Sequence, residues 1–182
     1  MSLQLVIGPM FSGKSTAVLQ EIRRSKFIGR KVMCITNSLD KRYSDTPAII
    51  THNQESCPAI ALDSLSCVLQ FAEFQQASYI VIEEAQFFPD LKEFVLNAVD
   101  VYKKHVLCVG LDGDSNRQPF GQILDLIPHC DSVQKFKAFC TVCNDGTPAI
   151  FTYRKPGAPL NQVNVAGADQ YEPRCRKHFS GL

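Results

Sequence analysis

Eight residues near the amino terminus have the types and spacing of a phosphate-binding loop. A glycine, four variable residues and then Gly-Lys-Ser match the P-loop pattern, and the match follows an apolar run and opens a segment with helical spacing. Backbone N–H groups of such a loop attract a polyphosphate, the lysine reaches the β- and γ-phosphates, and the serine hydroxyl can bind Mg²⁺. A glycine-rich turn that matches by chance lacks this context. The residues of the motif are Gly8, Pro9, Met10, Phe11, Ser12, Gly13, Lys14 and Ser15.

Two adjacent carboxylates follow a second apolar run, residues 79–82, which has the form of a Walker B strand. Ligands of open α/β sheets bind beyond the carboxyl ends of the strands, where the P-loop also lies. One carboxylate can hold a metal through water, and the next can accept a proton from the nucleophile. We therefore predict Glu83 as the metal-side residue and Glu84 as the general base. The alternative is a solvated acidic turn.

Four further side chains form two ligand pairs, Cys140-x-x-Cys143 and Cys175-x-x-His178. Each short turn presents two side chains to one tetrahedral metal, so the two turns predict a closed, structural Zn²⁺ site. A redox Cys-x-x-Cys normally opens a helix in a thioredoxin-like unit, which the sequence does not show, and unrelated core thiols are the other alternative. The remaining cysteines are predicted to be small packing residues: Cys34, Cys57, Cys67, Cys108 and Cys130.

Short apolar runs alternate with helical spacing along most of the chain, and this alternation predicts the elements that position the motifs. It is typical of an α/β fold: a P-loop, RecA-like parallel sheet with helices on both faces. After about residue 133 the pattern changes, so we expect an ATP-binding core at residues 1–137. We expect a small zinc-ribbon-like lobe at residues 138–182. The predicted strands are residues 3–7, 32–36, 79–82 and 106–111, the helices residues 13–30, 62–77 and from about Asp90, and the loop residues 37–54.

Composition and charge exclude several classes of protein. The chain has 182 residues, 45% of them hydrophobic, with a net charge of +1, which is too apolar and too balanced for a disordered chain. The near-neutral charge provides no general attraction to nucleic acid or to a membrane, so we expect neither as a partner. Neither a secretory signal nor an apolar run of about 18 residues is seen, so we expect a cytoplasmic protein.

Three functional classes fit a P-loop core with a carboxylate base and a zinc lobe. In an NTP hydrolase Glu84 would activate water, and in a small-molecule kinase it would deprotonate a substrate hydroxyl held near the lobe. A binding-only switch has no need of this base. We favour the kinase because the chain is short for a motor and shows no second set of ATPase motifs.

Five motifs in the same order resemble the type II thymidine kinases, the family of cellular and bacterial enzymes. The resemblance covers essentially the whole chain. It implies transfer of the γ-phosphoryl group of ATP to the 5′-hydroxyl of thymidine, with Mg²⁺, to give dTMP for nucleotide salvage. The motifs are residues 8–16, Glu84-x-Gln86-Phe87-Phe88, Leu111-Asp112-Gly113 with Arg117-x-Pro119-Phe120-Gly121, the two metal-ligand pairs, and Gly167-Ala168-Asp169-x-Tyr171.

The same resemblance assigns further roles. It implies that Asp40 and Arg42 lie beside the metal and phosphates, that Gln86 belongs to the ATP site, and that a loop near residues 154–169 closes over the base with main-chain hydrogen bonds. It also implies a homotetramer inhibited by dTTP. The substrate contacts expected on this basis are Met10, Ser115, Phe120, Thr152, Val163, Asn164, Val165, Ala166 and Tyr171.

Two departures from the family pattern affect the predicted site. Glu83 stands where the family usually has Asp, and its extra methylene can shift a metal-bound water. Ser115 stands where many members have an aromatic residue that stacks on the base. A lost stacking ring is worth on the order of 1 kcal/mol or more, although Phe120 can compensate. A broader deoxynucleoside kinase is therefore the alternative function, with a P-loop ATPase behind it.

Overall fold

The computed structural model describes residues 1–39, 47–50, 55–163 and 166–180. Four residues singled out from the sequence lie outside the described residues: Asp40, Arg42, Asn164 and Val165.

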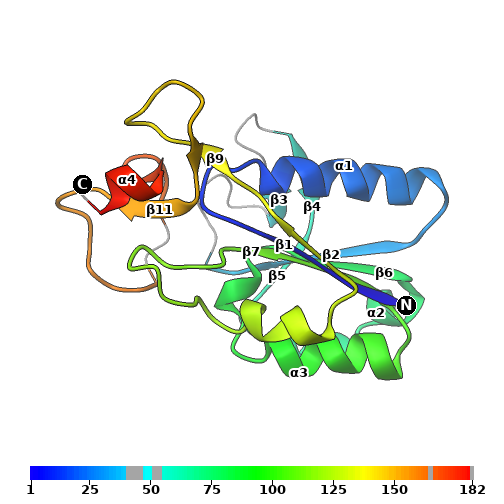
Figure 1. The fold of residues 1–182 in the computed structure, drawn as a ribbon. Helices are drawn as coiled ribbons and strands as arrows, with labels where there is room; N and C mark the ends of the chain where they lie inside the picture. Colours follow the sequence, from blue (N-terminus) through cyan, green and yellow to red (C-terminus); the bar gives the residue numbers. More distant parts are fainter. Residues whose placement is uncertain (40–46, 51–54, 164–165, 181–182) are drawn as a thin grey trace.

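A six-stranded sheet forms the centre of the molecule, and every pair of neighbouring strands in it is parallel, which confirms the predicted sheet. The strand order is β5-β2-β6-β7-β1-β8. The carboxyl ends of the strands point toward the C-terminal lobe, so loops that leave those ends gather there (Figure 1). The strands are β1 (Ser2–Ile7), β2 (Val32–Asn37), β5 (Ile60–Leu62), β6 (Tyr79–Ile82), β7 (His105–Gly110) and β8 (Ser132–Lys135).

Helices cover both faces of this sheet, as the alternating sequence predicts. Helix α1 (Lys14–Phe27) lies on one face, and α3 (Leu91–Leu96), which continues into a π-helical turn η3 (Asn97–Val101), lies on the other (Figure 1). Strand β1 shows how one strand contributes side chains to the hydrophobic clusters on both faces of the sheet. Leu3, Leu5 and Ile7 pack in the cluster beneath α3, whereas Val6 packs in the cluster beneath α1, because side chains alternate along a strand.

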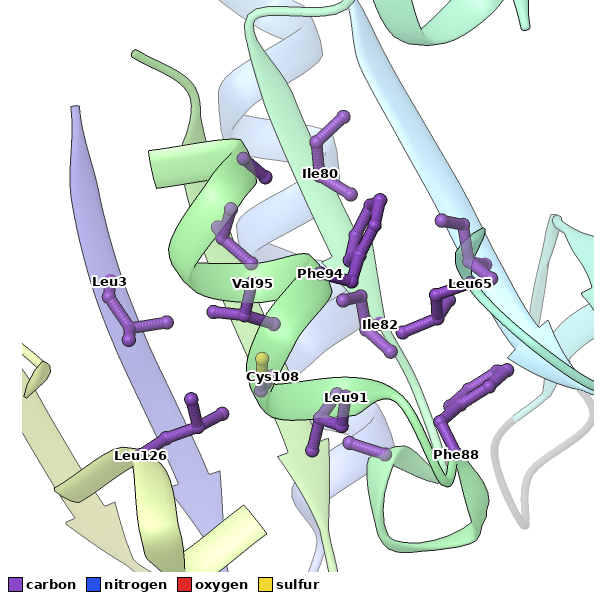
Figure 2. Packing of buried hydrophobic residues seen from close by; sticks show 14 of the residues in the cluster. Leu3, Leu65, Ile80, Ile82, Phe88, Leu91, Phe94, Val95, Cys108 and Leu126 are labelled. Carbon is purple, nitrogen blue, oxygen red and sulfur yellow. The ribbon is translucent and has the colours of Figure 1, made fainter. Parts of the chain in front are cut away.

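The larger hydrophobic cluster fills the space between α3 and the sheet (Figure 2). Leu91 and Val95 of α3 are fully buried against Ile80 and Ile82 of β6 and Cys108 of β7. All residues of β6 are buried, as expected for a central parallel strand covered on both sides. This packing fixes the end of β6, where the two predicted catalytic carboxylates begin.

The prediction of one continuous helix over residues 62–77 is wrong. It is divided into a 3-10 helix, η1 (Ser66–Gln70), and a short α2 (Ala72–Gln76), with extended backbone at Phe71. A helix does begin after Asp90, as predicted, but the Asp90 carboxylate accepts hydrogen bonds from the N–H groups of Leu65 and Ser66. Partial burial opposes ionisation of Asp90, but these hydrogen bonds and one from Ser64 lower its pKa. A contact from outside the segment therefore organises its start.

Four strands of the described core were not predicted. The segment expected to be loop contains β3 (Ala48–Ile50), which pairs with β4 (Ser56–Pro58) and buries Ile49 beneath α1. Strands β5 and β8 were also missed. The first three of these strands have only three residues each, and β8 is exposed along its whole length, so none shows a readable hydrophobic period.

The C-terminal part forms small antiparallel pairs instead of extending the sheet. Its own buried cluster is Ala138, Cys140, Ala149 and Cys175, separate from the two clusters of the core. The division between residues 137 and 138 stays a prediction. The elements of this lobe are β9 (Ala138–Phe139), β10 (Pro148–Ala149), β11 (Phe151–Arg154), β12 (Tyr171–Arg174) and α4 (Arg176–Phe179), and the core also has 3-10 helices η2 (Ala85–Phe87) and η4 (Ile123–His129).

Among the helices of the described residues, none has the length and apolar character needed to cross a membrane.

Core packing makes a direct prediction for two phenylalanines. Phe74 is fully buried and its ring contacts those of Phe94 and Tyr102, whereas Phe27 is 91% exposed. We expect Phe74→Ala to lower the free energy of unfolding by about 3–5 kcal/mol, because it removes buried area and leaves a cavity. Phe27→Ala should change it by less than about 0.5 kcal/mol. Urea denaturation checks both variants, and equal stabilities would contradict the packing described.

Candidate active site and metal centre

The P-loop connects the end of β1 to the start of α1. Gly8 has φ 146°, and a Cβ there would lie 2.5 Å from the carbonyl oxygen of Phe136, so only glycine fits. Gly13 has φ 81° and precedes the first turn of α1. The Lys14 ammonium donates to the Pro9 carbonyl at 2.7 Å, so it lies across the loop where phosphates would sit. The predicted phosphate-binding residues 8–15 are therefore arranged as one compact loop.

The Walker B carboxylate and the P-loop serine are hydrogen-bonded to each other. Ser15 donates from its hydroxyl to Glu83 Oε1 at 2.6 Å, although the two residues are 68 positions apart. Glu83 is buried at the end of β6, and Ser15 is half-buried at the start of α1. Oxygen ligands are those that Mg²⁺ prefers, so this pair fits the predicted role of holding Mg²⁺ beside the phosphates.

Glu84, the predicted base, is held by the next polar side chain. Its backbone has φ 53°, a left-handed conformation that turns the chain sharply after β6. Its carboxylate accepts a hydrogen bond from Gln86 Nε2 at 2.6 Å. The other amide atom of Gln86, Oε1, accepts from the backbone N–H of Leu111 at 3.0 Å. Gln86 was predicted to bind ATP, and here its buried amide bridges Glu84 and the residue after β7.

Two glycines leave the room that this bridge needs. A Cβ at Gly110 would lie 2.3 Å from Gln86 Oε1, and a Cβ at Gly121 would lie 2.1 Å from the Gln86 carbonyl oxygen. Gly121 also has φ 60°, in the left-handed region. The position of Glu84 therefore depends on close backbone approach at both glycines.

A hollow of about 420 Å³, measured out to its open mouth, lies beside Glu84. The structure brings together seven residues predicted from the sequence, Glu84 and six of the expected substrate contacts. They are Met10, Glu84, Ser115, Phe120, Thr152, Ala166 and Tyr171.

Five lining residues were not predicted as contacts: Phe87, Leu111, Gly113, Asp114 and Gln162. The motifs quoted from the sequence contain Phe87, Leu111 and Gly113, and the Phe87 ring meets that of Phe120 edge to face at 5.4 Å. Asp114 belongs to none of these motifs, and Gln162 lies in the loop near residues 154–169 that the resemblance places over the base. Val163, a predicted contact, is 48% exposed and is not among the lining residues.

The lobe contacts the P-loop through Thr152. The backbone N–H of Met10 donates to the Thr152 hydroxyl at 3.0 Å, and this hydrogen bond is buried. Thr152 lies on β11, and both residues also line the hollow. The predicted substrate contact Thr152 thus also connects the phosphate loop to the metal-binding lobe.

The four predicted metal ligands converge. Their ligand atoms all lie within 4.8 Å of one another. Cys143 Sγ and Cys175 Sγ are 3.8 Å apart, and His178 Nδ1 lies 3.2–3.6 Å from the sulfurs of Cys140, Cys143 and Cys175. With Zn–S about 2.3 Å and Zn–N about 2.0–2.1 Å, a tetrahedron places two sulfurs about 3.8 Å apart and sulfur and nitrogen about 3.5 Å apart. The donor set therefore fits a tetrahedral metal such as zinc.

The thiols of this cluster differ in proton affinity. Burial opposes ionisation of Cys140, but hydrogen bonds from the backbone N–H groups of Cys175 and Cys143 lower the pKa of its thiol to about 6. Burial and the neighbouring thiols raise the pKa of Cys143 to about 11. Three adjacent thiols ionise together only when a cation compensates their charge, so a metal that bound here would release protons.

The other cysteines divide into two groups. Cys34, Cys57 and Cys108 are buried, as predicted for packing thiols, and burial raises the pKa of Cys34 to about 12. The prediction is wrong for Cys67, which is exposed. Cys130 is partly buried and packs against the larger hydrophobic cluster, as predicted for a packing residue.

The fold and these residues define a class: a P-loop nucleotide-binding protein with a carboxylate pair beyond its parallel strands and a Cys/His cluster in its C-terminal lobe that could hold a metal. The thymidine kinase family model matches residues 1–179.

Individual proteins agree with this match. The chain is 41% identical over 184 residues to thymidine kinase a of Arabidopsis thaliana, covering 98% of this chain and 74% of that protein. It is 37% identical to the human cytosolic thymidine kinase (96% and 71% covered) and 38% identical to the thymidine kinase of Variola virus (97% and 96%). The chain therefore belongs to the thymidine kinase family.

Replacement of one ligand tests the metal centre. We expect Cys140→Ala to lose bound zinc, because three remaining ligands cannot close a tetrahedral site. Elemental analysis of the purified protein measures the metal. Cys67→Ala removes an exposed thiol outside the cluster and should retain one equivalent. One full equivalent of zinc in Cys140→Ala would refute the ligand set.

Proposed function

We propose that this chain transfers the γ-phosphoryl group of ATP to the 5′-hydroxyl of thymidine, with Glu84 as general base. Membership of the thymidine kinase family supports the reaction. The observation that carries the residue assignment is the position of two neighbouring carboxylates. Glu83 is hydrogen-bonded to the P-loop serine, and Glu84 lines the adjacent hollow. The phosphate site and the proposed nucleoside site therefore meet at this pair.

The P-loop provides the phosphate end of the site. Backbone N–H groups at the start of α1 attract the polyphosphate, and Lys14 is within the loop to contact the β- and γ-phosphates. Mg²⁺, bound with ATP, would be held by Ser15 and Glu83 and would neutralise charge on the phosphate oxygens. The hydrogen bond between Ser15 and Glu83 holds their two oxygen atoms next to each other before ATP binds.

Glu84 provides the proton acceptor. As the 5′-oxygen forms its bond to the γ-phosphorus, the bond from that phosphorus to the β–γ bridging oxygen breaks, ADP leaves, and Glu84 takes the hydroxyl proton. Gln86 donates to the Glu84 carboxylate and is itself fixed by Leu111 N–H, so Gln86 is a positioning residue. Orientation of this kind brings the base to the hydroxyl without a further ordering step.

The hollow provides the nucleoside end. Its apolar surfaces come from Met10, Phe87 and Phe120, and Tyr171 and Thr152 add hydroxyl groups. A narrow, mostly apolar site selects by shape between a single-ring base and a purine. The predicted stacking on the substrate base is then assigned to the Phe87–Phe120 pair, since Ser115 offers no ring.

Ser115 also favours a second candidate, a kinase of broader deoxynucleoside range. This small side chain lines the hollow at the position where family members place an aromatic ring, and it leaves space beside the base. Transfer from ATP to a panel of deoxynucleosides distinguishes the candidates. Transfer to thymidine alone supports the narrow function, transfer to several pyrimidine deoxynucleosides supports the broader one, and ATP hydrolysis without transfer rejects both.

The names of two relatives support a cellular location. The bovine and human relatives are named cytosolic thymidine kinases, and we propose the cytoplasm for this chain. A homotetramer and feedback inhibition by dTTP stay predictions of the family resemblance.

Replacement of the base tests the mechanism. We expect Glu84→Gln to bind ATP and thymidine but to lower kcat by roughly 10²–10⁴-fold, because the amide cannot accept the hydroxyl proton. The matched control is Glu93→Gln, an exposed glutamate on α3, which should have wild-type kcat. Steady-state kinetics measure both variants. Near-normal turnover of Glu84→Gln would reject Glu84 as the base.

A further inference from the structure

A hydrogen bond beside the hollow joins the lobe to the core. Gln162 Nε2 donates to Asp114 Oδ2 at 2.9 Å, and both residues line the hollow. Asp114 follows β7 in the core, whereas Gln162 lies between β11 and β12 in the lobe. Neither residue belongs to the P-loop, the carboxylate pair or the metal centre.

Asp114 is a rigid acceptor. Its Oδ1 accepts hydrogen bonds from the backbone N–H groups of Asn116 at 2.8 Å and Gln118 at 2.9 Å. Its own backbone N–H donates to the Gln118 carbonyl at 2.9 Å, and Gly113 pairs with Pro119 at the base of the same turn. With 6% of its surface exposed, Asp114 is fixed by its own turn, and Oδ2 is directed at Gln162.

Gln162 lies in a much less constrained segment. Its side chain is exposed, and the neighbouring contacts stay inside the lobe: Arg154 Nη2 donates to the Asn161 carbonyl at 3.1 Å, and Lys155 Nζ donates to the Ala168 carbonyl at 2.6 Å. These contacts shape the segment but do not attach it to the core. The hydrogen bond from Gln162 to Asp114 attaches the segment to the core at the edge of the hollow.

We propose that Asp114 and Gln162 form a clasp that holds residues 155–163 against the nucleoside site and thereby strengthens nucleoside binding. The identity of the nucleoside rests on the proposed function. A segment that is already held in place loses less conformational freedom when the substrate binds, so the clasp lowers the KM for the nucleoside. The ATP site lies at the P-loop and is not altered by it.

Removal of the donor tests the clasp. Gln162→Leu keeps much of the side-chain volume and removes the hydrogen bond to a charged acceptor, so we expect the KM for thymidine to rise about five- to tenfold. The KM for ATP and kcat should stay within about twofold, because neither depends on this contact. The matched control is Asn161→Leu, since Asn161 contacts Arg154 through its backbone carbonyl. A wild-type KM for thymidine in Gln162→Leu overturns the proposal.

A reversed pair separates a specific hydrogen bond from a general packing effect. Gln162→Glu places two carboxylates face to face and should raise the KM for thymidine more than Gln162→Leu does. Asp114→Asn with Gln162→Glu restores one donor and one acceptor in the opposite direction, and it should return the KM to within about twofold of wild type. If the KM for thymidine of the double variant is as high as that of Gln162→Glu, the clasp is overturned.

Hydrogen–deuterium exchange tests the clasp without any enzymatic assay. In the substrate-free protein, we expect faster exchange in peptides covering residues 155–163 for Gln162→Leu and unchanged exchange for Asn161→Leu. Unchanged exchange in Gln162→Leu overturns the clasp even if the enzyme phosphorylates thymidine. If the wild type does not phosphorylate thymidine, the proposed function fails, and the exchange result alone decides about the clasp.

Discussion

The hydrogen bond from Ser15 to Glu83 joins the two parts on which the rest of the site depends. One partner opens the helix that follows β1, and the other closes β6, two strands away in the sheet. Because the strands are parallel, their carboxyl ends meet at one edge, and a serine and a carboxylate 68 residues apart become neighbours. Because Glu84 follows Glu83 directly in the chain, the contact between Ser15 and Glu83 also helps to fix the position of Glu84.

The buried core supports that edge in a specific way. The β6 strand is packed on both faces, so its end cannot shift without disturbing α1 or α3. Beyond it, Gln86 fits between the backbone of β7 and the turn at Gly121 with no space for a Cβ at either glycine. The sharp turn at Glu84 is thus maintained by neighbours on three sides, which suits a group that must meet a substrate hydroxyl at a defined place.

Local patterns allowed much of the site to be predicted. The P-loop, the β6 carboxylates and each Cys/His pair are contained in a few consecutive residues whose spacing has a chemical reason. The fold joins the P-loop to the carboxylates, and it joins the two Cys/His pairs to each other. Features that depend on distant contacts were missed. Asp90 starts η1 from another segment, and the Asp114–Gln162 pair joins residues 48 apart. Strand β8 is exposed throughout and so carries no periodic signal of burial.

The hydrogen bond from Met10 to Thr152 divides the P-loop between two tasks. Its first half directs a backbone N–H to β11 of the lobe, which leaves the second half, with Lys14 and Ser15, to face the phosphates. Strand β11 and the first half of the P-loop are therefore thermodynamically linked, because whatever orders one favours the ordered form of the other. A strand of the lobe that also pairs with the segment leading to Cys175 thereby contributes to how firmly the nucleotide loop is preorganised, and nucleotide binding in turn reinforces that strand.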